Sequence, residues 1–178
     1  GQSRVILSMN LASPPTRTRC LFFSIPAMSA GLFPGLEYPE RVKRVNRLID
    51  HLLPQFRREF TAMVMITRGG IIPGGMLAEA MDVTHLLTAA VDFPAQSEQE
   101  QNKLMAWPDF IQFPSDELLR GRPTLIVDDV WGSGRTITAV KNRVSSAGGF
   151  PETCVLHFNP HRNLFGKARP EYYAAITD

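Results

Sequence analysis

The chain has 178 residues, of which 44% are hydrophobic and 20% are charged, with a formal net charge of +2 at pH 7. This length and composition predict one globular domain over residues 1–178, and so small a charge does not by itself indicate a nucleic-acid-binding protein. No apolar run approaches the ~18 residues of a membrane helix. The two cysteines, Cys20 and Cys154, make neither a disulfide framework nor a metal-ligand cluster, so we expect a cytoplasmic, reducing setting with no membrane partner.

The first third of the chain predicts two short strands and one helix. Apolar runs at Arg4–Met9 and Cys20–Ile25 are typical of strands. Pro54 ends or kinks the helix that follows them. That helix is predicted from Pro39 onward because hydrophobic residues recur at helical spacing at Val42, Val45, Leu48, Ile49, Leu52 and Leu53.

Basic residues lie among the hydrophobic positions of this helix, at Arg41, Lys43, Arg44 and Arg47. A basic helix face can contact RNA, but a solvated face is the more common outcome for such a pattern. We therefore do not expect nucleic acid as a partner, although an RNA-binding regulator stays open as an alternative.

The middle of the chain predicts a strand at Ala62–Ile66, a loop at Thr67–Gly75 and a short helix at Met76–Met81. A further strand is expected at Leu86–Val91. The polar stretch Phe93–Trp107 predicts a long loop, and both a mobile lid and a plain surface excursion fit its length.

The last part continues the alternation of strands and helices. Such alternation predicts an α/β fold with a mostly parallel sheet covered by helices on both faces, in which ligands bind at the carboxyl ends of the strands. The predicted elements are a short strand and helical turn within Pro108–Arg120, a strand at Thr124–Asp129, a helix at Ile137–Ala147 ended by Gly148 and Gly149, and strands at Cys154–Phe158 and Tyr172–Ile176.

The most informative stretch is Thr124–Thr136, TLIVDDVWGSGRT. Its apolar strand ends in Asp128 and Asp129, whose carboxylates suit ribose hydroxyls directly or through a magnesium ion. A helix N-terminus follows, with unpaired backbone N–H groups and a partial positive charge that favour a phosphate. Small and hydroxyl residues that let backbone approach a ligand and donate to it stand in between, at Gly132, Ser133, Gly134 and Thr136. The stretch predicts a sugar-phosphate site.

The loop Thr67–Gly75 predicts a second anion site at the same edge of the sheet. Arg68 is its one charged side chain and could bind a pyrophosphate oxygen. Gly69 and Gly70 could donate backbone N–H groups to the same ligand.

These two stretches resemble the motifs of the type I phosphoribosyltransferases. LIVDDVWGSGRT is similar to the family's phosphate-loop motif, with Ser133 in the usual threonine place. TRGGIIPGGMLAEAM is similar to the pyrophosphate loop and following helix of the xanthine-guanine and hypoxanthine branches. The resemblance covers about Ala62 to Asp178. It implies a cytoplasmic nucleotide-salvage enzyme that uses Mg²⁺ to transfer a phosphoribosyl group from phosphoribosyl pyrophosphate (PRPP) to a nucleobase, a purine in the nearest branch. It also implies a homodimer.

The resemblance also assigns roles to residues. Asp128 and Asp129 would hold the ribose hydroxyls, favour the positive charge that develops on the ring, and bind Mg²⁺ directly or through water. Arg68 and Gly69 would bind pyrophosphate, in a loop where the family often has a cis peptide bond. Tyr172 stands near the place of a stacking aromatic, with a core role as its alternative. The loop Phe93–Trp107 would close over the site. The 5′-phosphate would lie on the loop formed by Val130, Trp131, Gly132, Ser133, Gly134, Arg135 and Thr136.

The chain departs from the family's pattern in two places. Gly132 stands where the hypoxanthine-type enzymes have an aspartate that contacts the purine, and His157 stands near the place of a lysine. Because the chain has little sequence after Tyr172, we expect residues 1–36, including Arg4–Pro26, to supply the small hood over the base and residues 37–178 to form the core. These departures keep open a regulator that senses PRPP without catalysis.

Three further classes of protein or motif would place acids after an apolar strand, and each fits this sequence less well. A receiver domain places such acids on its first strand, whereas Asp128 and Asp129 come late in the chain. A nucleotide-binding P-loop ends in glycine, lysine and serine or threonine, whereas this loop has Arg135 at the lysine place. An acidic helix cap without a ligand would account for one loop but not both.

Overall fold

We describe the fold from a computed structural model, in which the described residues are 37–93 and 107–178. All of them belong to the unit Gly31–Asp178. The predicted strands Arg4–Met9 and Cys20–Ile25, the hood expected within residues 1–36 and the interior of the predicted loop Phe93–Trp107 lie outside the described residues.

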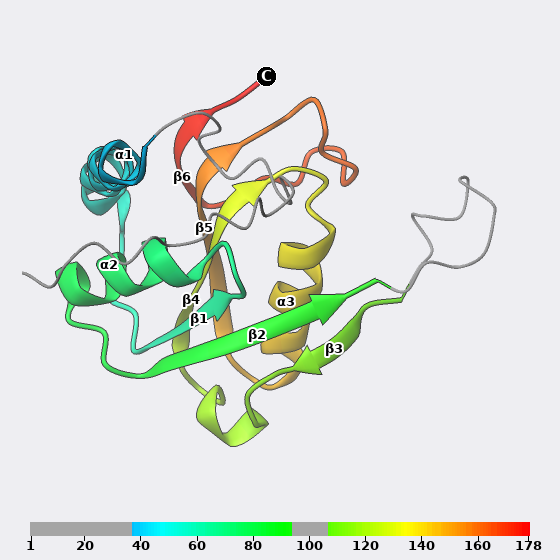
Figure 1. Cartoon of the computed structure of the whole chain (residues 1–178). Coiled ribbons are helices and arrows are strands. Elements are labelled where there is room, and N and C mark those ends of the chain that lie inside the picture. Colours follow the sequence, from blue (N-terminus) through cyan, green and yellow to red (C-terminus); the bar gives the residue numbers. More distant parts are fainter. Residues whose placement is uncertain (1–36, 94–106) are drawn as a thin grey trace, which may run out of the picture. The chain divides into compact units, whose positions relative to one another are not determined.

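The described residues form a six-stranded sheet with the strand order β3-β2-β1-β4-β5-β6 (Figure 1). All neighbouring strands are parallel except β3, which pairs with β2 in the antiparallel sense. This architecture confirms the predicted α/β fold. The strands are β1 (Ala62–Ile66), β2 (Leu86–Asp92), β3 (Asp109–Gln112), β4 (Pro123–Trp131), β5 (Phe150–Phe158) and β6 (Tyr172–Ile176). The helices are α1 (Tyr38–Leu52), α2 (Ile71–Met81) and α3 (Arg135–Ser146), with short 3₁₀ turns at Leu53–Gln55 and Asp116–Leu118.

Helices cover both faces of the sheet because successive strand residues point to opposite faces. Met63, Leu125 and Cys154 pack with α1 and α2 in one core cluster. Their chain neighbours Val64, Ile126 and Val155 pack with α3 in the other. The central strands are thus buried on both sides, which explains why their sequences are continuously apolar.

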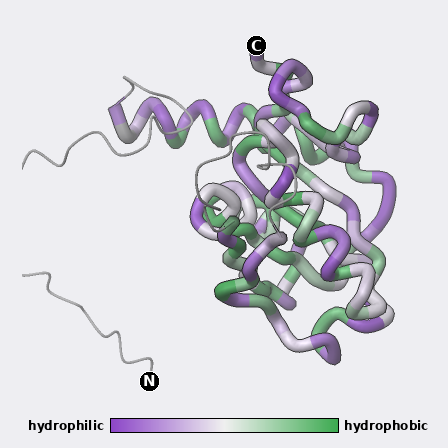
Figure 2. The backbone as a smooth tube through the Cα atoms, turned by 90° about the vertical axis from the view of Figure 1, so that its right-hand side faces the viewer, coloured by the Kyte–Doolittle hydropathy of each residue, from purple (hydrophilic) through white to green (hydrophobic). Residues whose placement is uncertain are grey.

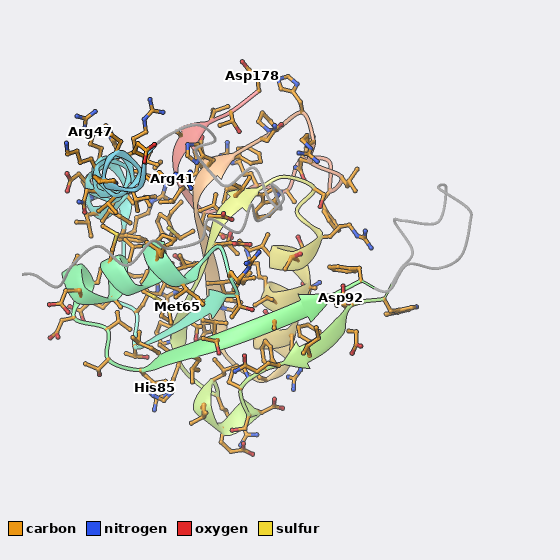
Figure 3. The ribbon with its side chains drawn as sticks, in the orientation of Figure 1. Arg41, Arg47, Met65, His85, Asp92 and Asp178 are labelled. Carbon is orange, nitrogen blue, oxygen red and sulfur yellow. The ribbon has the colours of Figure 1, made fainter. Side chains whose placement is uncertain are left out.

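The helix α1 presents a narrow apolar stripe to the sheet. Val45, Ile49 and Leu52 are buried, and Figure 2, where α1 runs lengthwise at the upper left, shows hydrophobic residues recurring among hydrophilic ones. The four basic residues are exposed, and Lys43 pairs with Glu40 at 2.8 Å. Arg41 and Arg47 are labelled on this helix in Figure 3. This is the arrangement expected of a solvated helix face.

The helix α2 begins at Ile71, five residues before the predicted start at Met76. Pro73 is tolerated because it lies in the first turn, where a backbone N–H has no partner within the helix. Gly74 is required by close packing, since a Cβ atom there would lie 2.5 Å from the Cγ atom of Met65. Proline and glycine suggested a loop here, but in the fold they serve a helix start and a helix-strand contact.

The strand β4 also extends beyond its predicted end at Asp129. Val130 and Trp131 continue the parallel pairing with His157 and Phe158 of β5. The loop before α3 is therefore shorter than the predicted span of Val130 to Thr136. Within residues 37–93 and 107–178, no helix is long and apolar enough to cross a membrane.

A buried hydrogen-bond group fixes the start of β6 to β5. The Glu171 carboxylate accepts hydrogen bonds from the backbone N–H of Thr153 at 2.7 Å and from its hydroxyl at 2.6 Å, and it pairs with Lys141 of α3. Burial by itself would raise the pKa of Glu171, but the hydrogen bonds from Lys141 and Thr153 outweigh it, so this pKa lies below its usual value.

We predict that Glu171→Ala lowers the free energy of unfolding at pH 7 by about 2 kcal/mol, because it leaves the N–H and hydroxyl of fully buried Thr153 unpaired. Glu171→Gln keeps an acceptor and should cost less. A folded-state pKa below the unfolded value stabilises the protein above pH 4.5 and is lost as the pH falls. Chemical denaturation should therefore show the gap between wild type and Glu171→Gln closing on acidification. A gap that stays constant would contradict this account.

Candidate functional site

The two acids of the motif lie near the carboxyl end of β4, where both are half-buried. The backbone N–H of Asp129 donates a hydrogen bond to the Asp128 carboxylate at 2.8 Å. Burial raises the pKa of Asp128 well above its usual value, and the neighbouring charge of Asp129 raises it further. Two carboxylates in so confined a place favour a cation or the hydroxyl groups of a ligand.

The turn between β1 and α2 lies directly against these acids. A Cβ atom added to Gly69 would be 2.3 Å from the Asp129 Oδ1 atom, and one added to Gly70 would be 2.1 Å from the carbonyl oxygen of Val127. The peptide bond between Thr67 and Arg68 is cis, as the resemblance implied for this loop. The structure thus brings together Gly69 and Asp129, which are 60 positions apart in the sequence.

The loop before α3 has one crowded glycine and one open glycine. Gly134 has a φ of 81°, and a Cβ atom there would lie 2.5 Å from the Nε1 atom of Trp131. No heavy atom among the described residues lies within 4 Å of a Cβ atom placed on Gly132, so a side chain would fit there. The Ser133 hydroxyl accepts a 3.4 Å hydrogen bond from the backbone N–H of Arg135. Arg135 and Thr136 open α3, where the first backbone N–H groups have no partner within the helix and attract anions.

The predicted phosphate loop is held in place by residues that the motif did not reveal. Trp131 is 3% exposed, and its indole N–H donates a hydrogen bond to Asn163 Oδ1 at 3.2 Å. The backbone N–H of Leu164 donates to the carbonyl of Ser133 at 3.1 Å. Asn163 belongs to the segment between β5 and β6, and its spacing from the motif gave no signal of this contact.

The side chain of Arg135 lies away from the helix N-terminus that it opens. Its guanidinium stacks over the ring of Phe93, with Cζ 4.1 Å from the ring centroid. The backbone N–H of Arg135 therefore faces the predicted phosphate site, while its charge lies on the side of β2. Arg68, at the other loop, is exposed.

Tyr172 lies in the core rather than at the site. It is 3% exposed, packs on Phe56 at 4.7 Å between ring centroids, and donates a hydrogen bond to Glu152 at 2.5 Å. Burial, together with Glu152, raises the pKa of the Tyr172 hydroxyl to about 12. Its ring faces are therefore occupied by protein, which corrects the prediction that it stacks on a ligand and agrees with the core role that we named as the alternative.

His157 ends close to the acids. It is 9% exposed and pairs with Val130 across the β4–β5 ladder. Burial lowers the pKa of His157, Asp129 raises it, and Arg44 of α1 lowers it, with a net decrease. The imidazole is therefore neutral at pH 7, and α1 contributes positive charge to this end of the sheet.

The acidic pair would hold a metal only in part. Within residues 37–93 and 107–178, no group of three or more histidine, cysteine, aspartate or glutamate side chains converges on one point. Such a pair suits a hard cation that keeps several waters and takes its other ligands from a bound phosphate.

The sequence pattern of the phosphoribosyl transferase domain family matches residues 36–170. The chain is 35% identical over 81 residues to a xanthine-guanine phosphoribosyltransferase of Cereibacter sphaeroides, an alignment that covers 45% of each protein. It is 29% identical over 106 residues to an adenine phosphoribosyltransferase of Myxococcus xanthus, covering 58% of each. The chain therefore aligns with about half the length of these relatives.

Solved structures share the fold. The purine phosphoribosyltransferase from Pyrococcus horikoshii superposes with a TM-score of 0.64 at 24% identity, covering 76% of this chain and 85% of that one. The xanthine-guanine-hypoxanthine phosphoribosyltransferase of Helicobacter pylori superposes with a TM-score of 0.61 at 15% identity, covering 80% and 86%. The match over residues 36–170 includes both loops and the acidic pair, and the chain belongs to the phosphoribosyl transferase domain family.

Proposed function

We propose that this protein transfers the phosphoribosyl group of PRPP to a purine base and releases pyrophosphate, with Mg²⁺ as cofactor. The observation that carries the proposal is the contact of Gly69 with the Asp129 carboxylate. This contact joins a loop suited to pyrophosphate to the acids suited to ribose, at the distance expected for two parts of one ligand. The names of the xanthine-guanine and adenine relatives support a purine as the acceptor.

Each part of PRPP has a matching group at this end of the sheet. The 5′-phosphate would accept hydrogen bonds from Ser133, Thr136 and the backbone N–H groups that open α3. The ribose hydroxyls would donate to Asp128 and Asp129. The pyrophosphate would bind to Arg68 and to the backbone of Gly69.

The reaction needs positioning and electrostatics more than covalent help from the protein. A base nitrogen donates its electron pair to the anomeric carbon while the bond from that carbon to the pyrophosphate oxygen breaks. Pyrophosphate leaves with the bonding pair, and the base loses the proton of the attacking nitrogen to solvent. The ring carries positive charge in an oxocarbenium-like transition state. Asp128 and Asp129 stabilise that charge, and the two loops hold the reacting atoms in line.

The donor set at the acids fits Mg²⁺ carried in with the substrate. The carboxylates offer oxygen ligands, and the absence of a larger ligand cluster within the described residues suits an ion that shares its coordination with PRPP and water. When bound, the ion would neutralise part of the pyrophosphate charge.

The base itself is decided beyond these contacts. Gly132 offers open space where hypoxanthine-type enzymes have an aspartate, so this chain lacks that contact to the purine. We propose a purine acceptor recognised without this carboxylate.

The direct test of the proposed function is a panel of bases. Adenine, guanine, hypoxanthine, xanthine and uracil are each incubated with the full chain, PRPP and Mg²⁺, and pyrophosphate release is measured. We expect release with at least one purine and none with uracil. Release with uracil alone would contradict a purine acceptor, and PRPP binding without turnover for any base would favour a sensor instead of an enzyme.

The acidic pair supplies a second test. Asp128→Asn and Asp129→Asn should each weaken Mg²⁺-dependent PRPP binding by about tenfold or more, since a hydrogen bond to a charged group contributes roughly 1.5–3 kcal/mol. Calorimetry measures the affinity. Asp82→Asn is the matched control, because Asp82 caps the other end of α2 with a φ of 54°, a conformation that asparagine also adopts. Unchanged affinity in both site variants would remove the acids from the site.

The contact between the loops predicts a separation of binding from stability. Gly69→Ala would push the Asp129 carboxylate aside, and because a side-chain end can move, the melting temperature should change little while PRPP affinity falls about tenfold. Gly75→Ala is the control within the same segment, since nothing described lies within 4 Å of its added Cβ atom. Equal PRPP affinity in the two variants would show that the Gly69 contact has no part in binding.

A further inference from the structure

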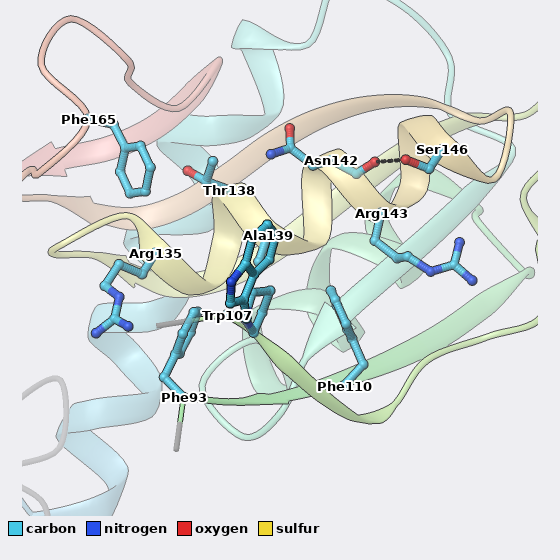
Figure 4. A pocket seen from close by; sticks show the side chains of 11 residues that line it. Phe93, Trp107, Phe110, Arg135, Thr138, Ala139, Asn142, Arg143, Ser146 and Phe165 are labelled. Carbon is cyan, nitrogen blue, oxygen red and sulfur yellow. Dashed lines mark hydrogen bonds between the residues drawn. The ribbon is translucent and has the colours of Figure 1, made fainter. Parts of the chain in front are cut away.

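A groove of about 390 Å³ runs along the outer side of α3. The inner side of this helix buries Ile137, Val140 and Val144 in the core, and the groove follows the opposite side (Figure 4). Of the residues predicted to bind PRPP, its described lining includes Arg135 alone. The groove is therefore a different place from the proposed phosphoribosyl site.

The walls of the groove are aromatic. Phe93, Trp107, Phe110 and Phe165 line it, and Trp107 is 84% exposed. In Figure 4, Phe93, Trp107 and Phe110 stand along one side of α3, and Phe165 stands across the helix from them. A volume of this size lies within the range of small-molecule sites, and aromatic walls favour a flat ring that can stack on them.

Two polar atoms in the groove are buried without a partner. The Nη2 atom of Arg135 and the Oγ1 atom of Thr138 have no hydrogen-bond partner among the described residues. Buried polar atoms are nearly always hydrogen-bonded in folded proteins, because an unpaired one is destabilising. These two atoms offer donors to a ligand from one end of the groove.

The charge of the lining favours an anion. Within the described residues, the lining contains two arginines and no acidic side chain. Arg143 is already paired with Asp116 at 2.8 Å. Arg135 is therefore the cation that has a hydrogen-bond donor to spare.

We propose that this groove is a second ligand site that binds a planar aromatic anion. The ring of the ligand stacks among Phe93, Trp107 and Phe110, and its acidic group accepts hydrogen bonds from Arg135 Nη2 and the Thr138 hydroxyl. The proposal does not depend on the proposed transfer reaction, because the groove and its open donors are outside the two loops.

The test uses two dyes that share one ring system. The full chain is titrated with 1-anilinonaphthalene-8-sulfonate and with N-phenyl-1-naphthylamine, which lacks the sulfonate, in the presence of saturating PRPP and Mg²⁺. We expect one sulfonate dye to bind per chain, with energy transfer from Trp107, and the neutral dye to bind at least about tenfold more weakly. Equal affinity for the two dyes, no binding, or displacement of the sulfonate dye by PRPP would overturn the proposal.

Variants locate the site. Thr138→Val and Arg135→Lys should each weaken the sulfonate dye by about tenfold, since each removes one donor to the anion. Thr138→Val should leave the melting temperature unchanged or higher, because it removes an unpaired buried hydroxyl. Arg143→Lys keeps the pair with Asp116 and should leave the affinity unchanged. An affinity that both site variants leave unchanged, or that Arg143→Lys lowers equally, would overturn the assignment.

Discussion

The contact on which the site depends is that of the Gly69–Gly70 turn with the carboxyl end of β4. Hydrogen takes the place of a side chain at both positions, because a Cβ atom would overlap the Asp129 carboxylate or the Val127 carbonyl. Parallel pairing of β1 with β4 brings the two strand ends level. Both loops therefore open onto one edge of the sheet, where a single ligand can reach the acids and two sets of backbone donors.

The surrounding fold keeps that edge charged but poised. Burial on both faces of β4 raises the pKa of Asp128, and the shared negative charge of the pair is suited to a cationic transition state. The segment after β5 adds rigidity, since Asn163 and Leu164 hold Trp131 and Ser133 through hydrogen bonds. The phosphate loop is thus ordered by contacts from outside its own motif.

The sequence predicts the central strands and the acidic pair well because these depend on local patterns. The bounds of Ala62–Ile66 and Tyr172–Ile176 were predicted to the residue. The start of α2 was predicted wrongly because Pro73 and Gly74 usually interrupt helices, and only tertiary packing on Met65 explains them. The contacts of Asn163 with Trp131, and the position of the Arg135 side chain over Phe93, arise between distant segments and have no local pattern.

A crystal structure of the full chain with PRPP and Mg²⁺ tests the central claim most directly, because the claim concerns where two phosphate groups of one ligand lie. We expect the 5′-phosphate within about 3 Å of the backbone nitrogens between Ser133 and Thr136, and the pyrophosphate at Arg68 and Gly69. The ribose hydroxyls should contact Asp128 and Asp129. A ligand that binds away from either loop, or that leaves the acids without contact, would contradict the account.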